Sequence, residues 1–209
     1  MGELESPASP RRRSDGEQTH TAILETAMRI ASIEGLGSLT IGRLAKELGI
    51  SKSGLFAHFK SKERLQRETI DAARAVFEHE VLRPGMGHEP GLGQIEGLCE
   101  AYLSYVERGV FPGGCFFAHM LAEFDAPEGP IHDELEADQR GWVGMLVQLI
   151  ETAQKQGEID PAVEPRQLAF ELFAPLELAN YLFTLHRDPS FVEHGRQAVA
   201  DTLARVAPR

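Results

Sequence analysis

Between residues 40 and 59, apolar side chains recur with the period of an α-helix. Four of them stand at positions i, i+3, i+4 and i+7: Ile41, Leu44, Ala45 and Leu48. This spacing places them on one face of an amphipathic helix. Gly49 follows where a helix favours a left-handed exit residue, and Ser51 can cap a second helix. Leu55 and Phe59, four residues apart, form the inward face of that second helix, so the pattern predicts a helix-turn-helix.

The helical period continues on both sides of this unit. A first helix is predicted to begin at Ser14, which has capping-box spacing to Glu17, and to end near residues 35–37. Thr40 suits the N-cap of the second helix, because its side-chain oxygen can accept a bond from a free backbone N–H.

A long fourth helix is predicted over residues 61–82, with Ser61 as its cap and Pro84 at its end. It would span about 30 Å, which suits a helix that links two domains. The later apolar segments also have helical spacing, and none alternates as a strand would. The sequence therefore predicts an all-α fold of about nine helices. The predicted divisions are a disordered basic tail at 1–13, a helix-turn-helix domain at 14–65 and a C-terminal domain at 66–209.

Charge is distributed unevenly along the chain. The net charge of −11 by itself argues against a nucleic-acid partner. Between Arg11 and Ile70, however, the chain has 11 Lys/Arg and 7 Asp/Glu, whereas residues 71–209 have 10 and 23. A basic N-terminal region on an acidic remainder suits a protein that presents one end to phosphates. The basic triplet at 11–13 could contact DNA, or it could be a solvated tail.

Composition limits the other classes of protein. The two cysteines, Cys99 and Cys115, lie among apolar residues and favour a reducing cytoplasm over a disulfide framework. No apolar run reaches the roughly 18 residues that a membrane span needs, so we expect no membrane association. Residues 1–16 lack the apolar centre of a signal peptide. We also expect no cofactor.

A longer motif surrounds the helix-turn-helix. It consists of Gly-x-x-x-Leu-Thr before the second helix, then Leu-Gly-Ile-Ser, then Phe-x-His-Phe-x-Ser-Lys-Glu. From Ala22 to Leu65 the chain thereby resembles the N-terminal domain of the TetR/AcrR-type transcriptional regulators. The remaining chain is similar to that family only in size and helical pattern. The resemblance implies a homodimer in which each subunit has a three-helix DNA-binding head and a C-terminal ligand-binding and dimerisation domain. Such proteins usually repress, and a small molecule releases them from DNA.

The resemblance also implies a set of DNA contacts. Backbone phosphates would be bound near the helix N-termini, and the early turns of the second helix would face the major groove, as helix geometry favours independently. Gly54 stands where the family often has Thr or Ser, and Phe56 where it usually has Tyr, so two hydroxyl contacts are missing. An ordinary solvated helix face is the alternative. The expected DNA-binding residues are Thr40, Ser51, Lys52, Ser53, Gly54, Phe56, His58 and Lys62.

The last two predicted helices are apolar on more than one face. A helix with two apolar faces must bury both, one in its own domain and one against a partner. A four-helix interface with two-fold symmetry would set the recognition helices about 34 Å apart, or a multiple, so the double-stranded operator would be near-palindromic. A single thick core is the alternative. The expected dimer-interface residues are Leu172, Leu176, Ala179, Phe183, Val199 and Leu203.

Aromatic and methionine side chains gather in the C-terminal domain. They suit an adaptable cavity for a hydrophobic or aromatic effector, and they also suit a filled core. A regulator without a ligand would have the filled core, so a cavity of roughly 300 Å³ or more separates the two readings. Gln148 and Asn180 are polar residues that could orient a ligand. The expected pocket residues are Tyr102, Phe116, Phe117, His119, Met120, Trp142, Met145, Leu149, Phe170 and Phe173.

Two other functions agree with less of the sequence. Cys115 and His119 have i, i+4 spacing and could form a nucleophile–base pair, but no orienting group or oxyanion site accompanies them. His119 and Glu123 have the same spacing, but the further ligands of a metal site are missing. The sequence therefore predicts neither an enzyme nor a metal site.

Overall fold

The computed structural model describes residues 10–125 and 128–208, with side chains from residue 18 onward. The helices in order are α1 (Pro10–Glu34), α2 (Ile41–Leu48), α3 (Lys52–Phe59), α4 (Lys62–Phe77), the π-helical turn η1 (Glu78–Leu82), α5 (Arg83–Met86), α6 (Leu92–Glu107), α7 (Phe116–Phe124), α8 (Pro130–Lys155), α9 (Pro165–His186) and α10 (Ser190–Arg205). Because α4, η1 and α5 follow one another without a break, these ranges hold nine separate helical segments and no strand. The predicted all-α fold is confirmed.

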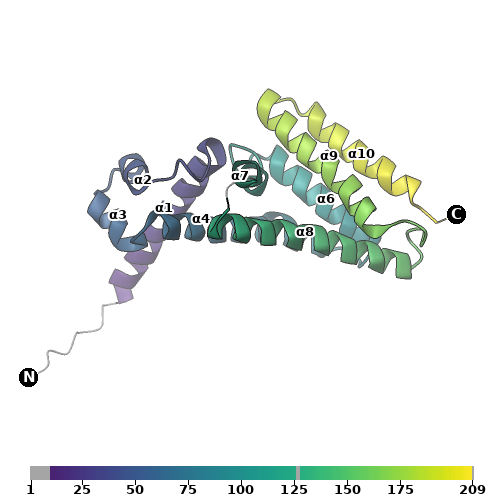
Figure 1. Cartoon of the computed structure of the whole chain (residues 1–209), viewed down its shortest axis with the longest axis horizontal. Helices are drawn as coiled ribbons and strands as arrows, with labels where there is room; N and C mark the ends of the chain where they lie inside the picture. The colour runs from purple at the N-terminus through teal and green to yellow at the C-terminus, as the bar shows by residue number, and fades with distance from the viewer. Residues whose placement is uncertain (1–9, 126–127, 209) are drawn as a thin grey trace, which may run out of the picture.

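The molecule is elongated, with α1–α3 at one end and α6, α9 and α10 at the other (Figure 1). We call α1–α3 with the first turn of α4 the head, and the rest of the chain the body. In Figure 1, α4 and α8 lie along the length of the molecule, and α7 lies where the body meets the head. The helix α7 also packs against both α1 and α8.

Side-chain caps define the helices of the head. The Oγ1 of Thr40 accepts a hydrogen bond from the Arg43 backbone N–H at 3.1 Å, and Ser51 Oγ accepts one from Gly54 at 3.0 Å. Ser61 caps α4 in the same way. Gly49 ends α2 with φ 66°, the left-handed conformation that suits glycine. The predicted caps and turn are confirmed.

The first helix begins earlier than expected. It starts at Pro10, so the predicted cap at Ser14 lies inside it. Proline suits the first turn of a helix because its φ is already fixed and its missing N–H is not needed there. The predicted disordered tail is therefore wrong for residues 10–13, and residues 1–9 lie outside the described part of the chain.

The fourth helix ends later than expected. It continues past Pro84 to Met86, by way of the π-helical turn η1. The wider turn changes the hydrogen-bond register just before the proline, whose ring would clash with a carbonyl in an ideal α-helix. Gly85 also fits closely against Leu98 of α6, since a Cβ at residue 85 would lie 2.6 Å from Leu98 Cδ2.

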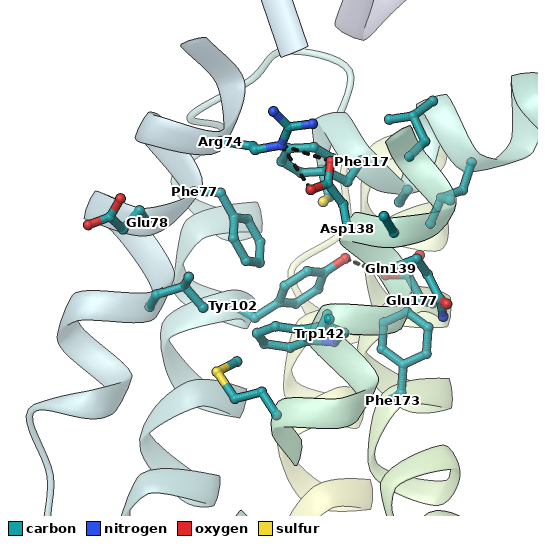
Figure 2. Close-up of a pocket in the computed structure, with 18 residues that line it drawn as sticks. Arg74, Phe77, Glu78, Tyr102, Phe117, Asp138, Gln139, Trp142, Phe173 and Glu177 are labelled. Carbon is teal, nitrogen blue, oxygen red and sulfur yellow. Dashed lines mark hydrogen bonds and ion pairs between the residues drawn. The ribbon is translucent and has the colours of Figure 1, made fainter. Parts of the chain in front are cut away.

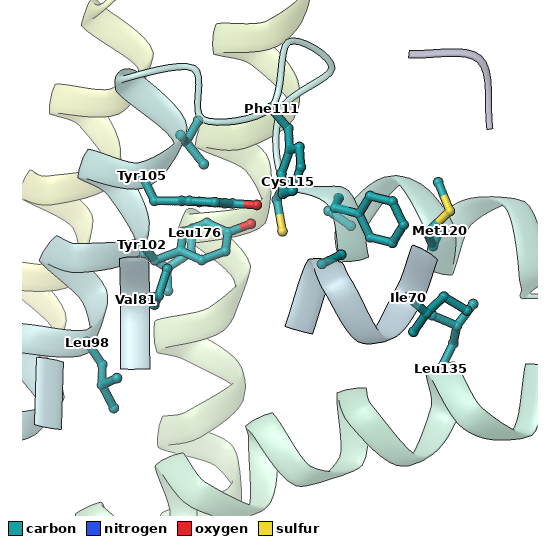
Figure 3. Packing of buried hydrophobic residues seen from close by; sticks show 14 of the residues in the cluster. Ile70, Val81, Leu98, Tyr102, Tyr105, Phe111, Cys115, Met120, Leu135 and Leu176 are labelled. Atoms are coloured by element: carbon teal, nitrogen blue, oxygen red, sulfur yellow. The ribbon is translucent and has the colours of Figure 1, made fainter. Parts of the chain in front are cut away.

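The core of the body forms around α6, which packs against α8, α9 and α10. Figure 3 shows Tyr102 and Tyr105 of α6 with their hydroxyls near Cys115, and Phe111 beside them. By length and a mean hydropathy of 1.2, α9 could cross a membrane, but a core helix of a soluble protein passes the same test. Here α9 packs against α6, α8 and α10.

Candidate DNA-binding surface and ligand cavity

The exposed face of α3 carries the residues expected to read DNA. Lys52, Ser53 and Gly54 are exposed at its first turn, and Phe56 is 54% exposed. Leu55 and Phe59 face inward and are fully buried. The capping oxygen of Thr40 accepts a backbone bond, which leaves its hydroxyl proton able to donate to a phosphate. Ser51 Oγ also lies 3.2 Å from Ser53 Oγ, a hydrogen bond in which either hydroxyl can be the donor.

Among the described side chains of the head, the lysines have no carboxylate partner, whereas Arg29, Arg43 and Arg64 are paired. Arg29 bonds Glu47 and Arg43 bonds Glu34, at 2.6 and 2.7 Å. Within the described residues, no ion pair involves Lys46, Lys52, Lys60 or Lys62. These ammonium groups are the head's available positive charges for an anionic partner.

His58 and Lys62 already have neighbours within the head. His58 is half-buried, and its ring centroid lies 6.0 Å from that of His20, which stacks on Phe59 at 5.1 Å. Lys62 Nζ donates to the Gly37 carbonyl oxygen at 2.6 Å, although its side chain is exposed. His20 was not expected from the sequence, because only the folded head brings α1 next to α3.

The loop at residues 35–39, just before α2, is held from the body. The carboxylate of Glu123 in α7 accepts hydrogen bonds from the backbone N–H groups of Leu36 and Gly37, both at 2.6 Å. Gln66 of α4 donates to the Leu36 carbonyl oxygen at 3.0 Å. Carboxylate–amide bonds are among the stronger hydrogen bonds in proteins, so α7 is firmly joined to the loop that positions α2.

A second contact between head and body depends on a glycine. A Cβ at Gly113 would lie 1.6 Å from the Ser32 carbonyl oxygen near the end of α1. On the other side of the same loop, Arg187 donates to the Pro112 carbonyl oxygen at 2.9 Å. The loop between α6 and α7 thus joins α1 to the end of α9.

The body contains a cavity of about 430 Å³. Five aromatic side chains from α4, α6, α7, α8 and α9 line it: Phe77, Tyr102, Phe117, Trp142 and Phe173. Phe77 meets the rings of Tyr102, Phe117 and Trp142 edge-on, at centroid distances of 6.4, 5.7 and 5.5 Å. Figure 2 shows these rings together, with the Arg74–Asp138 pair at one end and Phe173 towards the other.

Besides Glu78, charged groups stand at two places on the cavity wall. Arg74 donates to Asp138 at 2.8 Å and to Glu134 at 2.7 Å, and it also bonds Asp71. Burial opposes ionisation of Arg74, but its bonds to Glu134 and Asp138 raise its pKa, so it stays charged. Burial raises the pKa of Asp138, while Arg74 opposes that shift.

The second charged group is Glu177 on α9. Its carboxylate accepts a hydrogen bond from the Tyr102 hydroxyl at 2.8 Å. Burial raises the pKa of Glu177, and the Tyr102 bond offsets part of that rise. Within the described residues, no basic group forms an ion pair with this carboxylate.

Cys115 also borders the cavity, but it is not arranged as a nucleophile. Burial raises its pKa to about 11, so the thiol keeps its proton at neutral pH. His119, which has the spacing that could have made it a base for Cys115, does not border the cavity. The described residues likewise contain no group of three His, Cys, Asp or Glu that could hold a metal.

Half of the expected pocket residues line the cavity: Tyr102, Phe117, Trp142, Met145 and Phe173. The other expectations are wrong. Phe116, Met120 and Leu149 are packed in the core, His119 and Gln148 do not reach the cavity, and Asn180 instead accepts a bond from the Cys115 backbone N–H. Phe170 is 67% exposed, because it lies on the opposite face of α9 from Leu168 and Leu172.

Sequence reasoning missed the charged cavity residues, although a signal was present. Three of the four stand three or four positions from an aromatic residue of the same helix, on the same side. The pairs that share this spacing are Arg74 with Phe77, Asp138 with Trp142, and Glu177 with Phe173.

The dimer row expected on α9 and α10 is wrong for five of its six members. Leu172, Leu176, Ala179, Val199 and Leu203 are buried within the single chain, while Phe183 is half-buried. Periodicity identified two apolar faces on α9 but could not tell which one meets its own core. The solvent-facing side is a stripe of exposed apolar residues, at 67, 57, 46 and 74%: Phe170, Leu178, Tyr181 and Leu185.

The fold, a capped helix-turn-helix head on an all-helical body, is that of a DNA-binding transcriptional regulator. Residues 23–69 match the family model described as bacterial regulatory proteins, tetR family. Residues 91–199, half of the chain, match the tetracyclin repressor-like C-terminal domain. The chain belongs to the TetR family of transcriptional regulators.

Individual relatives are more distant. The chain is 30% identical over 105 residues to the nucleoid occlusion factor SlmA of Aliivibrio fischeri, which is 50% of each protein. It thus spans about half the length of that curated relative. A TetR regulator from Chloroflexus aurantiacus has the same fold, with a TM-score of 0.85 at 24% identity over 93% of this chain and 98% of that one. The structure of AibR with isovaleryl coenzyme A and operator DNA aligns at TM-score 0.68, with 22% identity over 90% and 97% of the two chains.

Proposed function

We propose that this TetR-family chain is a repressor that binds a near-palindromic operator as a homodimer and is released by a small hydrophobic or aromatic effector. The observation that carries the proposal is the aromatic cavity of about 430 Å³ in the body. It exceeds the roughly 300 Å³ at which small-molecule pockets begin. A ligand-independent regulator with a filled core, the main alternative, gives no reason for such a void.

The path from cavity to DNA-binding surface is short. Phe117 and Leu121 of α7 line the cavity, and Glu123 of the same helix holds the loop before α2. The helix α4 lines the cavity at Arg74 and Phe77, and carries Lys62 at its first turn. A ligand that displaces α7 or α4 would therefore move the head. The structure of AibR, which has the same fold, holds isovaleryl coenzyme A and operator DNA together, so a protein of this fold can carry both a ligand and DNA.

For the DNA-binding surface we propose two kinds of contact. Side chains at the first turn of α3, led by Lys52 and Ser53, would meet base edges in the major groove. Gly54, at the same turn, would also face the groove. The remaining residues of the surface would contact phosphates and sugars: Thr40, Ser51, Phe56, His58 and Lys62. The unpaired lysines of the head would supply the counter-charge that a net charge of −11 otherwise lacks.

For dimerisation we propose the exposed stripe of α9. Phe170, Leu178, Tyr181 and Leu185 repeat at helical spacing and expose large apolar surfaces that association would remove from water. We expect Leu185→Glu to dissociate the dimer and weaken operator binding, as measured by sedimentation equilibrium and DNA titration. Ile33→Glu, on an exposed apolar residue of the head, serves as the matched control for association. An unchanged dimer in Leu185→Glu would rule out this face.

The test of the DNA claim uses fragments from the upstream region of the chain's own gene, titrated at about 50 and 200 mM salt. Lys52→Ala should cost about 1–3 kcal/mol on the preferred sequence and relax its preference at one base pair. Lys62→Ala should weaken binding to all fragments alike and reduce the salt slope by about 1. Lys155→Ala, an exposed lysine of the body, is the control. Equal losses from both head substitutions would show that Lys52 contacts only phosphate.

The effector claim is tested on the same complex. A mixture of small apolar and aromatic compounds is fractionated, and each fraction is tested for displacement of the chain from operator DNA. At least one compound should release the DNA. The sole tryptophan, Trp142, lines the cavity, so its fluorescence reports occupancy directly. Release of DNA by a compound that leaves this fluorescence unchanged would contradict the cavity as the effector site.

A further inference from the structure

The charges around the cavity indicate what kind of ligand it takes. Four of its lining residues can be charged, and three of them are acidic: Glu78, Asp138 and Glu177, against Arg74. Glu78 is neutralised from outside by Arg83, at 3.0 Å. The remaining balance depends on Arg74 and Glu177.

Arg74 cannot serve as a free positive charge for an anionic ligand. Its guanidinium bonds three carboxylates, those of Asp71, Glu134 and Asp138. The other nearby cation, Arg67, approaches Glu134 at 3.8 Å and is shared with Glu63 at 3.5 Å. An anion entering this end of the cavity would have to displace carboxylates from a satisfied cluster, which is costly in a partly buried site.

Glu177 has the opposite deficiency. Its carboxylate lies among aromatic rings, with the Tyr102 hydroxyl as its hydrogen-bond donor and no basic partner among the described residues. Glu177 is half-buried, and a carboxylate taken partly out of water without a counter-ion is unfavourable unless it takes up a proton or gains a cation. A positively charged ligand would supply that cation.

The aromatic rings favour the same charge. Phe77, Tyr102 and Trp142 present π faces and edges around one space, and Trp142 is the ring type that attracts cations best. Phe117 and Phe173 add apolar surface, which suits a ligand whose charge is surrounded by hydrocarbon.

We infer that the effector is a lipophilic organic cation, whose positive charge lies between Glu177 and the rings of Tyr102 and Trp142. This assignment rests on the proposed function, since it names the ligand class of the cavity proposed above to bind the effector. It narrows the effector from any small hydrophobic or aromatic molecule to a cation, and it excludes anions.

Two pairs of compounds, each matched in shape but different in charge, test whether the cavity prefers a cation. Tetraphenylphosphonium and tetraphenylborate differ in the sign of their charge, and benzyltrimethylammonium and its neutral carbon isostere neopentylbenzene form a smaller pair. Binding to the full chain is followed by calorimetry and by fluorescence of the single tryptophan. We expect the cation of each pair to bind at least about tenfold tighter, which corresponds to about 1.4 kcal/mol of cation–π and ionic attraction. Equal or tighter binding of the borate or the hydrocarbon, or no binding of either cation, would overturn the inference.

Two variants test whether Glu177 causes the preference for cations. Glu177→Gln keeps an acceptor for Tyr102 but removes the charge, and it should reduce the cation preference about tenfold. Glu151→Gln removes one exposed negative charge of α8 and should leave the preference unchanged. Far-UV circular dichroism checks that both variants fold. A preference that survives Glu177→Gln, or falls equally in Glu151→Gln, would show that Glu177 does not select the ligand.

A separate measurement on the operator complex distinguishes the two proposals. If the cations bind with a Glu177-dependent preference but do not release DNA, the ligand class holds and the effector function is wrong. If a neutral compound releases DNA and quenches Trp142 while the cations do not bind, the effector function holds and the ligand class is wrong.

Discussion

The head and the body obtain their structure in different ways. In the head, α2, α3 and α4 each begin with a Ser or Thr side chain that caps the helix. In the body, α6, α7, α8 and α10 begin without a side-chain cap, and the interior keeps a cavity. It also buries the Tyr105 hydroxyl, for which the described residues offer no hydrogen-bond partner. Among α6 to α10, α9 alone has a side-chain cap, from Glu164, so the body depends more than the head on packing between distant segments.

This difference suits the two tasks. A surface that reads DNA must hold a few side chains in one arrangement, which caps and a filled core provide. A sensor needs at least two arrangements of similar free energy, which an incompletely filled interior permits. The comparison predicts that substitutions in the head act on stability and DNA binding together, while substitutions in the body act mainly on the response to ligand.

The largest effect is expected from Phe59→Ala in the head. Phe59 is fully buried, and removing a buried aromatic ring costs about 3–5 kcal/mol. Because the head core is small, we expect its melting to separate from that of the body, with loss of DNA binding and retention of cavity binding. Differential scanning calorimetry measures whether the head and the body melt separately, and Trp142 fluorescence measures ligand binding to the cavity.

Phe56→Ala is the matched control for this prediction, since Phe56 lies on the same helix and is exposed. Its effect on stability should stay within about 0.5 kcal/mol. One cooperative transition for Phe59→Ala, with both DNA and cavity binding lost, would show that head and body do not differ in the way described above.

The next largest effect is expected where the two parts meet. Gly113→Ala would place a Cβ 1.6 Å from the Ser32 carbonyl oxygen, so the loop or α1 must move. Overpacking of this kind costs about 1–3 kcal/mol, and hydrogen exchange should rise at the end of α1. Gly144→Ala is the control, because nothing lies within 4 Å of its Cβ position and alanine favours a helix by up to about 1 kcal/mol. If both variants have the same melting temperature, head and body are not in close contact at Gly113.

The sequence was most informative where structure is local. Thr40, Gly49, Ser51 and Ser61 each act within three or four residues of themselves, so spacing along the chain was sufficient to place them. The start of α1 and the end of the continuous helix formed by α4, η1 and α5 were placed wrongly. Proline is acceptable both outside a helix and at special positions within one.

The sequence was least informative where two apolar faces compete. On α9 it recognised both faces, but assigned Leu172 and Leu176 to the partner and Phe170 to the cavity, the reverse of what burial shows. Which face turns inward depends on α6, α8 and α10, which lie far away in sequence. Likewise, the bond from Glu123 to Leu36 joins residues 87 positions apart, and no periodicity could indicate it.

Glu123→Gln tests the connection between cavity and head. The amide can accept only one of the two backbone bonds, so a loss of about 1 kcal/mol in stability is expected at this partly exposed site. The larger change should be in regulation, because ligand binding would no longer be transmitted through α7. We expect the ligand-induced loss of operator affinity to shrink severalfold while cavity affinity is retained. Glu151→Gln is again the control, and an undiminished ligand response would exclude Glu123 from the path.

The smallest expected effect is that of Glu177 on the stability of the ligand-free body, and its size depends on pH. Burial raises the pKa of Glu177 above its ordinary value of 4.5, so the folded chain holds this proton more tightly than the unfolded chain. The stability that Glu177 lends is therefore greatest below pH 4.5 and is lost as the pH rises through the folded-state pKa. Without ligand, Glu177→Gln should melt a few degrees above the wild type at pH 8 and near it at pH 4.

Titrations common to both proteins cancel in this difference, so the pH dependence belongs to residue 177. A wild type that is more stable than Glu177→Gln at pH 8 would mean that the carboxylate already has a cation in the empty protein. The predicted order reverses once a cation is bound, because the wild type then gains the ion pair that the variant lacks. A residue that lowers the stability of the ligand-free body and raises that of the ligand-bound body is what a sensor requires, whereas Leu55 and Phe59, which fill the core of the head, carry no charge that a ligand could neutralise.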